Sequence, residues 1–233
     1  MAVVLAAGEG SRVAGREPKQ FIDLNGLSVI ARTVVNLDWC SRIVVVYHPA
    51  HLDRTRQLLT QAGSPTSVTL VPGGATRRLS ISAALAAVSD LSDDVPLVLQ
   101  NGASPNTPPR LVADCVAALE THEIAQAFIP AVATIIRHHD GELSEVLPRS
   151  SLGYAVDPTV FRLGCLRRIV AAQAARVHSG EMTTDTAREM GVAIRLVASP
   201  ESNVKLTTPN DLVLLQSLVA AHEPPDSGQR DRN

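Results

Sequence analysis

The chain has 233 residues, of which 45% are hydrophobic and 19% charged, and its formal net charge is −2. This length and composition suffice for one sizeable core and are short for two independent ones. The basic residues are scattered, so the chain lacks the positive surface that sequence-independent nucleic-acid binding requires, and no nucleic-acid partner is expected.

Short β-branched runs alternate with longer stretches of helical period, which is the pattern of parallel strands joined by crossover helices. In chain order, the predicted strands are Ala2–Ala6, Arg42–Tyr47, Ser67–Val71, Val95–Gln100, Gln126–Ala131 and Ala193–Val197. The predicted helices are Ser28–Leu37, His51–Gln61, Arg77–Val88, Pro108–Thr121, Gly164–Ala175, Thr184–Met190 and Thr208–Ala221. Several strands are apolar without alternation, as strands covered on both faces are. We therefore predict an α/β fold with a mostly parallel sheet flanked by helices.

One segment, Thr134 to Leu147, interrupts this alternation and is typical of two strands around an Asp140-Gly141 turn. We expect it to form the tip of a protruding β-hairpin arm at residues 133–155. An isolated hairpin is marginal in water, so the arm should pack on another subunit or on the core. Residues 1–222 are expected to form one domain, and the polar tail at 223–233 is expected to be disordered.

The cysteines and the first apolar run bear on the compartment of the protein. Cys40, Cys115 and Cys165 are an odd number, widely spaced and without a CxxC pair, which argues against a disulfide framework or a zinc site. The run from Ala2 to Ala7 has no basic residue before it and ends at a glycine, unlike a secretory signal or a membrane span. We expect a cytoplasmic protein without a membrane partner.

A glycine-rich loop follows the first predicted strand and contains Gly8, Gly10 and Gly15, together with the cations Arg12 and Lys19. Small residues let the backbone close around a triphosphate, and the cations bring positive charge to the phosphates. The pattern favours phosphoryl or nucleotidyl transfer, with simple positive-φ turns as the alternative. The loop fits neither the GxGxxG of nicotinamide-dependent oxidoreductases nor the GK[ST] ending of a P-loop.

The loop is the first of several motifs in a fixed order. LAAGEGSR at residues 5–12 and PKQF at 18–21 are followed by GGATRRLS at 73–80, the pair Thr184-Asp185, and NVKLTTPNDL at 203–212. From about Val3 to Leu215 the chain thereby resembles the 2-C-methyl-D-erythritol 4-phosphate cytidylyltransferase family, and it is also similar to ribitol-5-phosphate cytidylyltransferases. The resemblance implies a Rossmann-like nucleotidyltransferase domain that transfers CMP from CTP to a small phosphorylated polyol. By default that polyol is 2-C-methyl-D-erythritol 4-phosphate, an isoprenoid precursor, and pyrophosphate is released.

The resemblance also implies the site residues, which fall into three sets. Catalytic roles fall to Arg12, Lys19 and Lys205, and nucleotide contacts to Ala6, Ala7, Gly8, Gly74, Ser80 and Asn101. Acceptor contacts fall to Thr134, Arg149 and Lys205, with Arg149 reaching across a homodimer through the arm. Mg²⁺ is expected to be bound largely through the phosphates of CTP.

Several acidic positions of the family are changed in this chain. Asn101 replaces a metal-side aspartate and is a candidate neutral ligand for Mg²⁺, which prefers carboxylate. Ala133 and Ser202 replace two further aspartates, and AVDPTVF at 155–161 stands where the family has QTPQxF. A site that loses acceptors for polyol hydroxyls should reject that polyol. The alternatives are therefore another acceptor, such as ribitol phosphate or a phosphonate, or a catalytically degraded paralogue that binds nucleotide or regulates.

Overall fold

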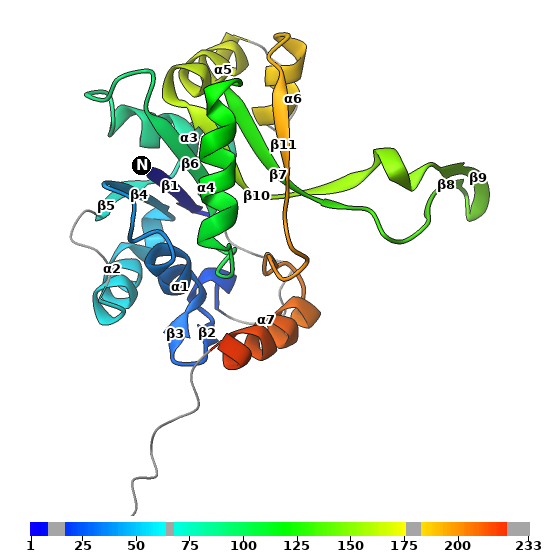
Figure 1. Ribbon diagram of the computed structural model, residues 1–233. Helices are drawn as coiled ribbons and strands as arrows, with labels where there is room; N and C mark the ends of the chain where they lie inside the picture. Colours follow the sequence, from blue (N-terminus) through cyan, green and yellow to red (C-terminus); the bar gives the residue numbers. More distant parts are fainter. Residues whose placement is uncertain (9–16, 64–67, 176–182, 223–233) are drawn as a thin grey trace, which may run out of the picture.

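A seven-stranded sheet forms the centre of the computed structural model, which describes residues 1–8, 17–63, 68–175 and 183–222 (Figure 1). Its strands are β1 (Ala2–Ala6), β4 (Ile43–Tyr47), β5 (Val68–Pro72), β6 (Pro96–Asn101), β7 (Ile124–Pro130), β10 (Gly153–Arg162) and β11 (Ile194–Ala198). The spatial order is β11-β7-β10-β6-β1-β4-β5. Only β10 runs against its neighbours in this sheet, so the prediction of a mostly parallel sheet is confirmed.

Strand β10 was not predicted from the sequence, and it lies between β6 and β7. Gly153 and Pro158 interrupt its sequence, and both residues are uncommon inside central strands. The structure accommodates them by an irregularity, because the pairing of β10 with β7 shifts register between Ala155 and Thr159. The local pattern of residues 153–162 therefore did not indicate a strand, and the strand is stabilised by its pairing with β6 and β7.

Helices cover both faces of the sheet. On one face α1 (Val29–Val35), α2 (Leu52–Gln61) and α4 (Pro109–Ala117) pack against it. On the other face lie α3 (Arg77–Ala86), α5 (Leu163–Ala175) and α6 (Thr183–Glu189). Alternate residues of β1 enter the two cores, Val4 on the first face and Val3 on the second. This arrangement explains why the strand is apolar without alternation.

A third, smaller core lies below the carboxyl ends of the strands, where α7 (Pro209–His222) contacts the ribbon of β2 (Asp23–Leu24) and β3 (Leu27–Ser28). Helix α7 begins as predicted. The backbone amides of Thr207 and Thr208 donate to the Asp211 carboxylate at 2.8 and 2.7 Å, and the Asp211 amide donates back to the Thr208 hydroxyl at 3.3 Å. This reciprocal capping holds the segment that precedes α7 in place.

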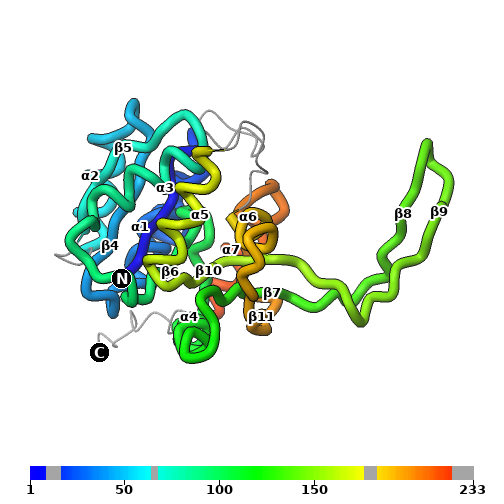
Figure 2. Tube along the Cα trace, turned by 90° about the horizontal axis from the view of Figure 1, so that it is seen from above, coloured from blue at the N-terminus to red at the C-terminus, as the bar shows by residue number. Residues whose placement is uncertain are grey.

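The predicted hairpin is confirmed as β8 (Ile135–His139) and β9 (Glu142–Leu147). Asp140 and Gly141 have φ of 49° and 84°, as a two-residue hairpin turn requires. Both views show the hairpin projecting far from the sheet on the extensions of β7 and β10 (Figures 1 and 2). The arm therefore exposes most of its own surface.

Among the described residues, no helix is long and apolar enough to cross a membrane. Cys40, Cys115 and Cys165 are buried with free thiols, and burial raises the pKa of Cys115 to about 12 and that of Cys165 to about 11. These two thiols therefore stay protonated and unreactive near neutral pH. Residues 223–233, expected to be disordered, lie outside the described ranges.

Candidate active site

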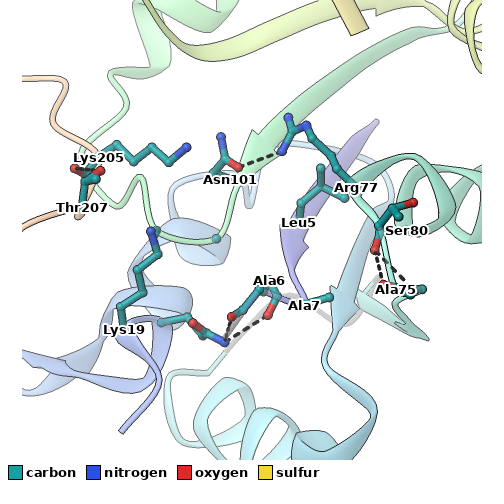
Figure 3. Close-up of a pocket in the computed structure, with 16 residues that line it drawn as sticks. Leu5, Ala6, Ala7, Lys19, Ala75, Arg77, Ser80, Asn101, Lys205 and Thr207 are labelled. Atoms are coloured by element: carbon teal, nitrogen blue, oxygen red, sulfur yellow. Dashed lines mark hydrogen bonds between the residues drawn. The ribbon is translucent and has the colours of Figure 1, made fainter. Parts of the chain in front are cut away.

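A cavity of about 320 Å³ opens where β1 and β6 end (Figure 3). Ligands of open α/β sheets bind at this carboxyl edge. The site residues expected from the sequence that line it are Ala6, Ala7, Gly8, Lys19, Gly74, Ser80, Asn101 and Lys205. Residues from five separate stretches of the chain thus converge on one cavity, while Arg12 falls in a stretch that the structure leaves undescribed.

Gln20, in the short 3-10 helix η1 (Lys19–Phe21), fixes the start of the glycine loop. Its buried side-chain amide donates to the backbone oxygens of Ala6 and Gly8, both at 3.1 Å. These bonds hold the end of β1 against η1. The glutamine of PKQF therefore shapes the loop backbone, a role that sequence reasoning did not assign.

Two ammonium groups reach the cavity, from Lys19 and Lys205 (Figure 3). The Lys19 Nζ donates to the backbone oxygen of Leu206 at 2.9 Å, which ties η1 to the segment that carries Lys205. Leu206 is itself held by a 2.8 Å bond from its amide to the oxygen of Ala103. The two cations are thereby fixed at one cavity and suit a polyanionic ligand.

The turn between β5 and α3 forms another wall. The Gly74 amide donates to the Ser80 hydroxyl at 3.2 Å. A side chain at Gly73 would place its Cβ 2.4 Å from the Cβ of Ala7, a distance that real contacts do not reach. Gly73 therefore lets this turn approach the end of β1 closely enough to complete the cavity.

A row of polar side chains crosses the end of β6. Arg77 donates to the Asn101 Oδ1 at 3.0 Å, and the Asn101 Nδ2 donates to the two carboxylate oxygens of Asp157 at 2.7 and 2.8 Å. Burial lowers the pKa of Arg77, and the Asp157 carboxylate opposes that effect. The sequence alone indicated no role for Arg77 or Asp157, although Arg77 is the arginine of the GGxxRxxS motif.

The same row bears on Mg²⁺. The Asn101 Oδ1, the candidate ligand atom, already accepts a hydrogen bond from a guanidinium cation. Within the described ranges, no group of three or more His, Cys, Asp or Glu side chains is placed to hold a metal ion. The side chains of this site therefore do not fit a protein-built magnesium cage, and Asn101 is a poor ligand.

The residues expected at the acceptor lie mostly elsewhere. Thr134 and Arg149 are exposed near the base of the arm and do not line the cavity of this subunit. The Arg149 guanidinium donates to the oxygen of Val132 at 2.9 Å. Thr184 and Asp185 start α6 and are also absent from the cavity lining. Of the predicted acceptor residues, only Lys205 shares the cavity with the nucleotide-binding set.

A largely parallel sheet with glycine turns and two lysines around a cavity at its carboxyl edge defines an α/β nucleotidyltransferase-like protein. The chain belongs to the 2-C-methyl-D-erythritol 4-phosphate cytidylyltransferase family, whose sequence model matches residues 1–221.

Individual relatives agree with this membership. The 2-C-methyl-D-erythritol 4-phosphate cytidylyltransferase of Thermobifida fusca is 33% identical over 94% of this chain and 92% of its own. That of Rubrobacter xylanophilus is 34% identical over 96% of both chains. Two solved structures share the fold. A 4-diphosphocytidyl-2C-methyl-D-erythritol synthase from Anaerococcus prevotii has a TM-score of 0.79 at 18% identity, over 94% of this chain and 97% of the other. A cytidylyltransferase from Thermus thermophilus has a TM-score of 0.77 at 22% identity, over 94% and 98%.

Proposed function

We propose that this chain transfers CMP from CTP to 2-C-methyl-D-erythritol 4-phosphate and releases pyrophosphate. This is the reaction for which its relatives are named. The observation that carries the proposal is the convergence of Lys19, Lys205 and the two glycine turns on one cavity at the carboxyl edge of the sheet. A cavity with cations and close backbone turns suits a nucleoside triphosphate.

In this reaction a phosphate oxygen of the acceptor attacks the α-phosphorus of CTP, and the bond from that phosphorus to the bridging oxygen of pyrophosphate breaks. Catalysis of such a transfer rests on positioning and on neutralising charge. Lys19 and Lys205 are proposed to contact the phosphates from the two parts of the wall that carry them, η1 and the segment before α7. Arg12 is assigned to the same task by the family motif.

Mg²⁺ is proposed to enter on the phosphates of CTP, because the described side chains build no cage for it. When bound there, it would supply positive charge to the leaving pyrophosphate. The described residues themselves supply the walls, the two ammonium groups and the row of Arg77, Asn101 and Asp157.

A homodimer joined through the arm is also proposed. Ile136 and Val146 face each other across the hairpin and are 52% and 59% exposed, and Leu143 nearby is 61% exposed. An isolated hairpin is marginal in water, so burial of these apolar side chains against another protein surface would stabilise the arm. A second copy would cover them and bring Arg149 to the cavity of its neighbour.

The dimer is tested by measuring mass in solution at micromolar concentration. The parent chain is expected to have the mass of two subunits, whereas the double variant I136D/V146D should be monomeric with an unchanged far-ultraviolet circular dichroism spectrum. A monomeric parent chain would refute the dimer.

The activity is tested by pyrophosphate release from CTP and Mg²⁺ with 2-C-methyl-D-erythritol 4-phosphate, and in parallel with ribitol phosphate and simple phosphonates. We expect release with the first acceptor and its loss in R12A, while D114N, an exposed change on α4, retains it. Turnover with another acceptor alone would reassign the substrate. CTP binding without turnover on any acceptor would support the degraded paralogue.

A further inference from the structure

The Asp157 side chain of β10 contacts the Asn101 side chain of β6. The two strands are antiparallel neighbours and pair Thr159 with Leu99. Toward Asp157 the regular pairing ends, because β10 shifts register between Ala155 and Thr159. The contact is therefore given by the side chains themselves, with the Asn101 Nδ2 at 2.7 and 2.8 Å from the two carboxylate oxygens of Asp157.

The Asp157 carboxylate is held from several sides. Besides Asn101, the Ser104 hydroxyl donates to its Oδ2. The backbone oxygen of Asp157 accepts a 2.6 Å bond from the Asn203 side chain, which is buried. A carboxylate fixed in both its backbone and its side chain offers its neighbours a defined point of negative charge.

Asp157 and the Arg77 guanidinium, which can only donate, together decide how the Asn101 amide is oriented. An ionised carboxylate can only accept hydrogen bonds, so the Nδ2 of Asn101 must face Asp157. The Oδ1 is thereby turned to Arg77, which donates to it at 3.0 Å and lines the cavity. Cation, neutral amide and anion thus stand in a row, with the amide dipole aligned between the charges.

We propose that Asp157 is a positioning residue of the candidate active site, which holds the Asn101 amide and, through it, the Arg77 guanidinium in the orientation that binds the nucleotide. The family resemblance implies an aspartate at position 101, where this chain has a neutral amide. In this chain the negative charge is displaced by one side chain, across the pair of β6 and β10. The proposal rests on the proposed nucleotide-binding function of the cavity.

A charge exchange follows from this geometry. Asn101→Asp alone would set two carboxylates in contact, which disfavours their ionised forms. Asp157→Asn alone would remove the charged acceptor of the Asn101 Nδ2. In N101D/D157N the amide and the carboxylate trade places, so that the new carboxylate on β6 faces Arg77 directly and the new amide on β10 donates to that carboxylate.

The experiment is a double-mutant cycle on the full chain with three readouts. These are the Kd of CTP in the presence of Mg²⁺, the kcat and KM of pyrophosphate release, and the Tm. Each single variant is expected to weaken CTP binding by about 10- to 100-fold, because it loses a hydrogen bond to a charged group. The exchanged pair should recover to within about threefold of the parent chain. D114N, which removes an exposed carboxylate paired with Arg110 on α4, is the matched control and should keep the parent Kd.

Three results would overturn the proposal. One is a D157N variant with the CTP Kd and KM of the parent chain. The second is an exchanged pair no better than the product of the single losses. The third is recovery of Tm without recovery of CTP affinity, which would make Asp157 a structural contact only. A parent chain that binds CTP without turnover would refute the proposed activity, while the cycle in Kd would still decide the role of Asp157.

Discussion

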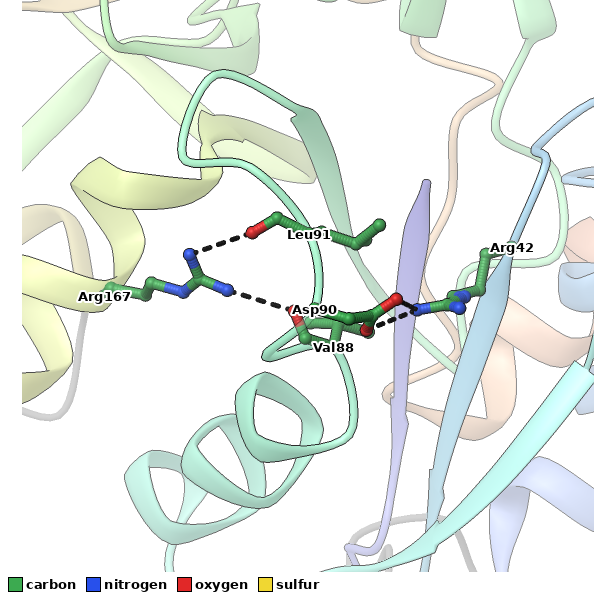
Figure 4. Close-up of polar contacts among 5 residues, drawn as sticks. All are labelled: Arg42, Val88, Asp90, Leu91 and Arg167. Carbon is green, nitrogen blue, oxygen red and sulfur yellow. Dashed lines mark hydrogen bonds and ion pairs between the residues drawn. The ribbon is translucent and has the colours of Figure 1, made fainter.

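At the carboxyl ends of β1 and β6, charged side chains line a cavity (Figure 3). At the opposite end of the sheet, charged side chains instead form hydrogen bonds that hold a loop in place (Figure 4). There Arg42 donates to both carboxylate oxygens of Asp90 at 2.9 and 3.1 Å. Arg167 of α5 donates to the backbone oxygens of Leu91 and Val88 at 3.2 and 3.0 Å. These guanidinium groups hold the connection between α3 and β6.

The cavity arginine has a different set of partners. Among the described residues, the Arg77 side chain donates to a single acceptor, the Asn101 Oδ1. Since a guanidinium carries five N–H donors, most of the donors of Arg77 stay available to a ligand. In this chain the cavity arginine thus differs from Arg42 and Arg167 in its place at the cavity and in the smaller number of acceptor atoms that the protein supplies to it.

The largest expected effect comes from removing the charge of Lys205 at the cavity, with Arg42 at the opposite end of the sheet as the comparison. Lys205→Met should lower kcat/KM for pyrophosphate release by about 10²- to 10³-fold, as loss of one charge-stabilising donor does. Arg42→Met should leave kcat/KM unchanged within error, because Arg42 serves only a loop. Steady-state kinetics of both variants, with Tm as a check on folding, provide the measurement. Equal losses in the two variants would contradict the distinction between the two ends.

Much of the fold was predictable because buried parallel strands and their helices leave local patterns. β1 has the predicted bounds Ala2–Ala6, since an uninterrupted apolar run fits a strand covered on both faces. Ser28 was predicted to start α1 and is its N-cap, with its hydroxyl accepting from the Ala31 amide at 3.3 Å. β10 was not predicted, because its pairing with β6 and β7 rather than its composition makes it a strand.

The candidate site, like the fold, was predictable from the sequence only in part. Glycine and lysine motifs indicated the cavity wall, because close turns and phosphate charges require those residue types. The contact of Asp157 with Asn101 left no local signal, since it joins strands far apart in the sequence at a point where β10 is irregular. The altered AVDPTVF segment drew attention to the position without showing what the new carboxylate contacts.

A smaller effect is expected from packing at the cavity wall. Gly102→Ala would place a Cβ 2.8 Å from the Cβ of Ala6 and should destabilise the fold by about 1–3 kcal/mol. The double variant A6G/G102A removes the clashing methyl group and should recover part of this loss. Urea unfolding of the three chains measures both effects. A G102A variant as stable as the parent chain would show that the two strand ends can move apart, and would contradict the view of a tightly fixed wall.

The smallest effect belongs to the loop end, where Arg42 and Asp90 form an exposed ion pair. The side-chain hydrogen bond from Arg42 lowers the pKa of Asp90 below its ordinary value. Stability from this contact is therefore fully present above the unfolded pKa of an aspartate, about 3.9, and is lost as the pH falls through the lower folded pKa. In Arg42→Met, an NMR titration of the Asp90 carboxyl should show its pKa move up to the ordinary value, and the Tm at neutral pH should change little because exposed pairs contribute little. An unmoved Asp90 titration would mean that the pair does not persist in solution, and a large fall in Tm would contradict the expectation that this exposed pair contributes little to stability.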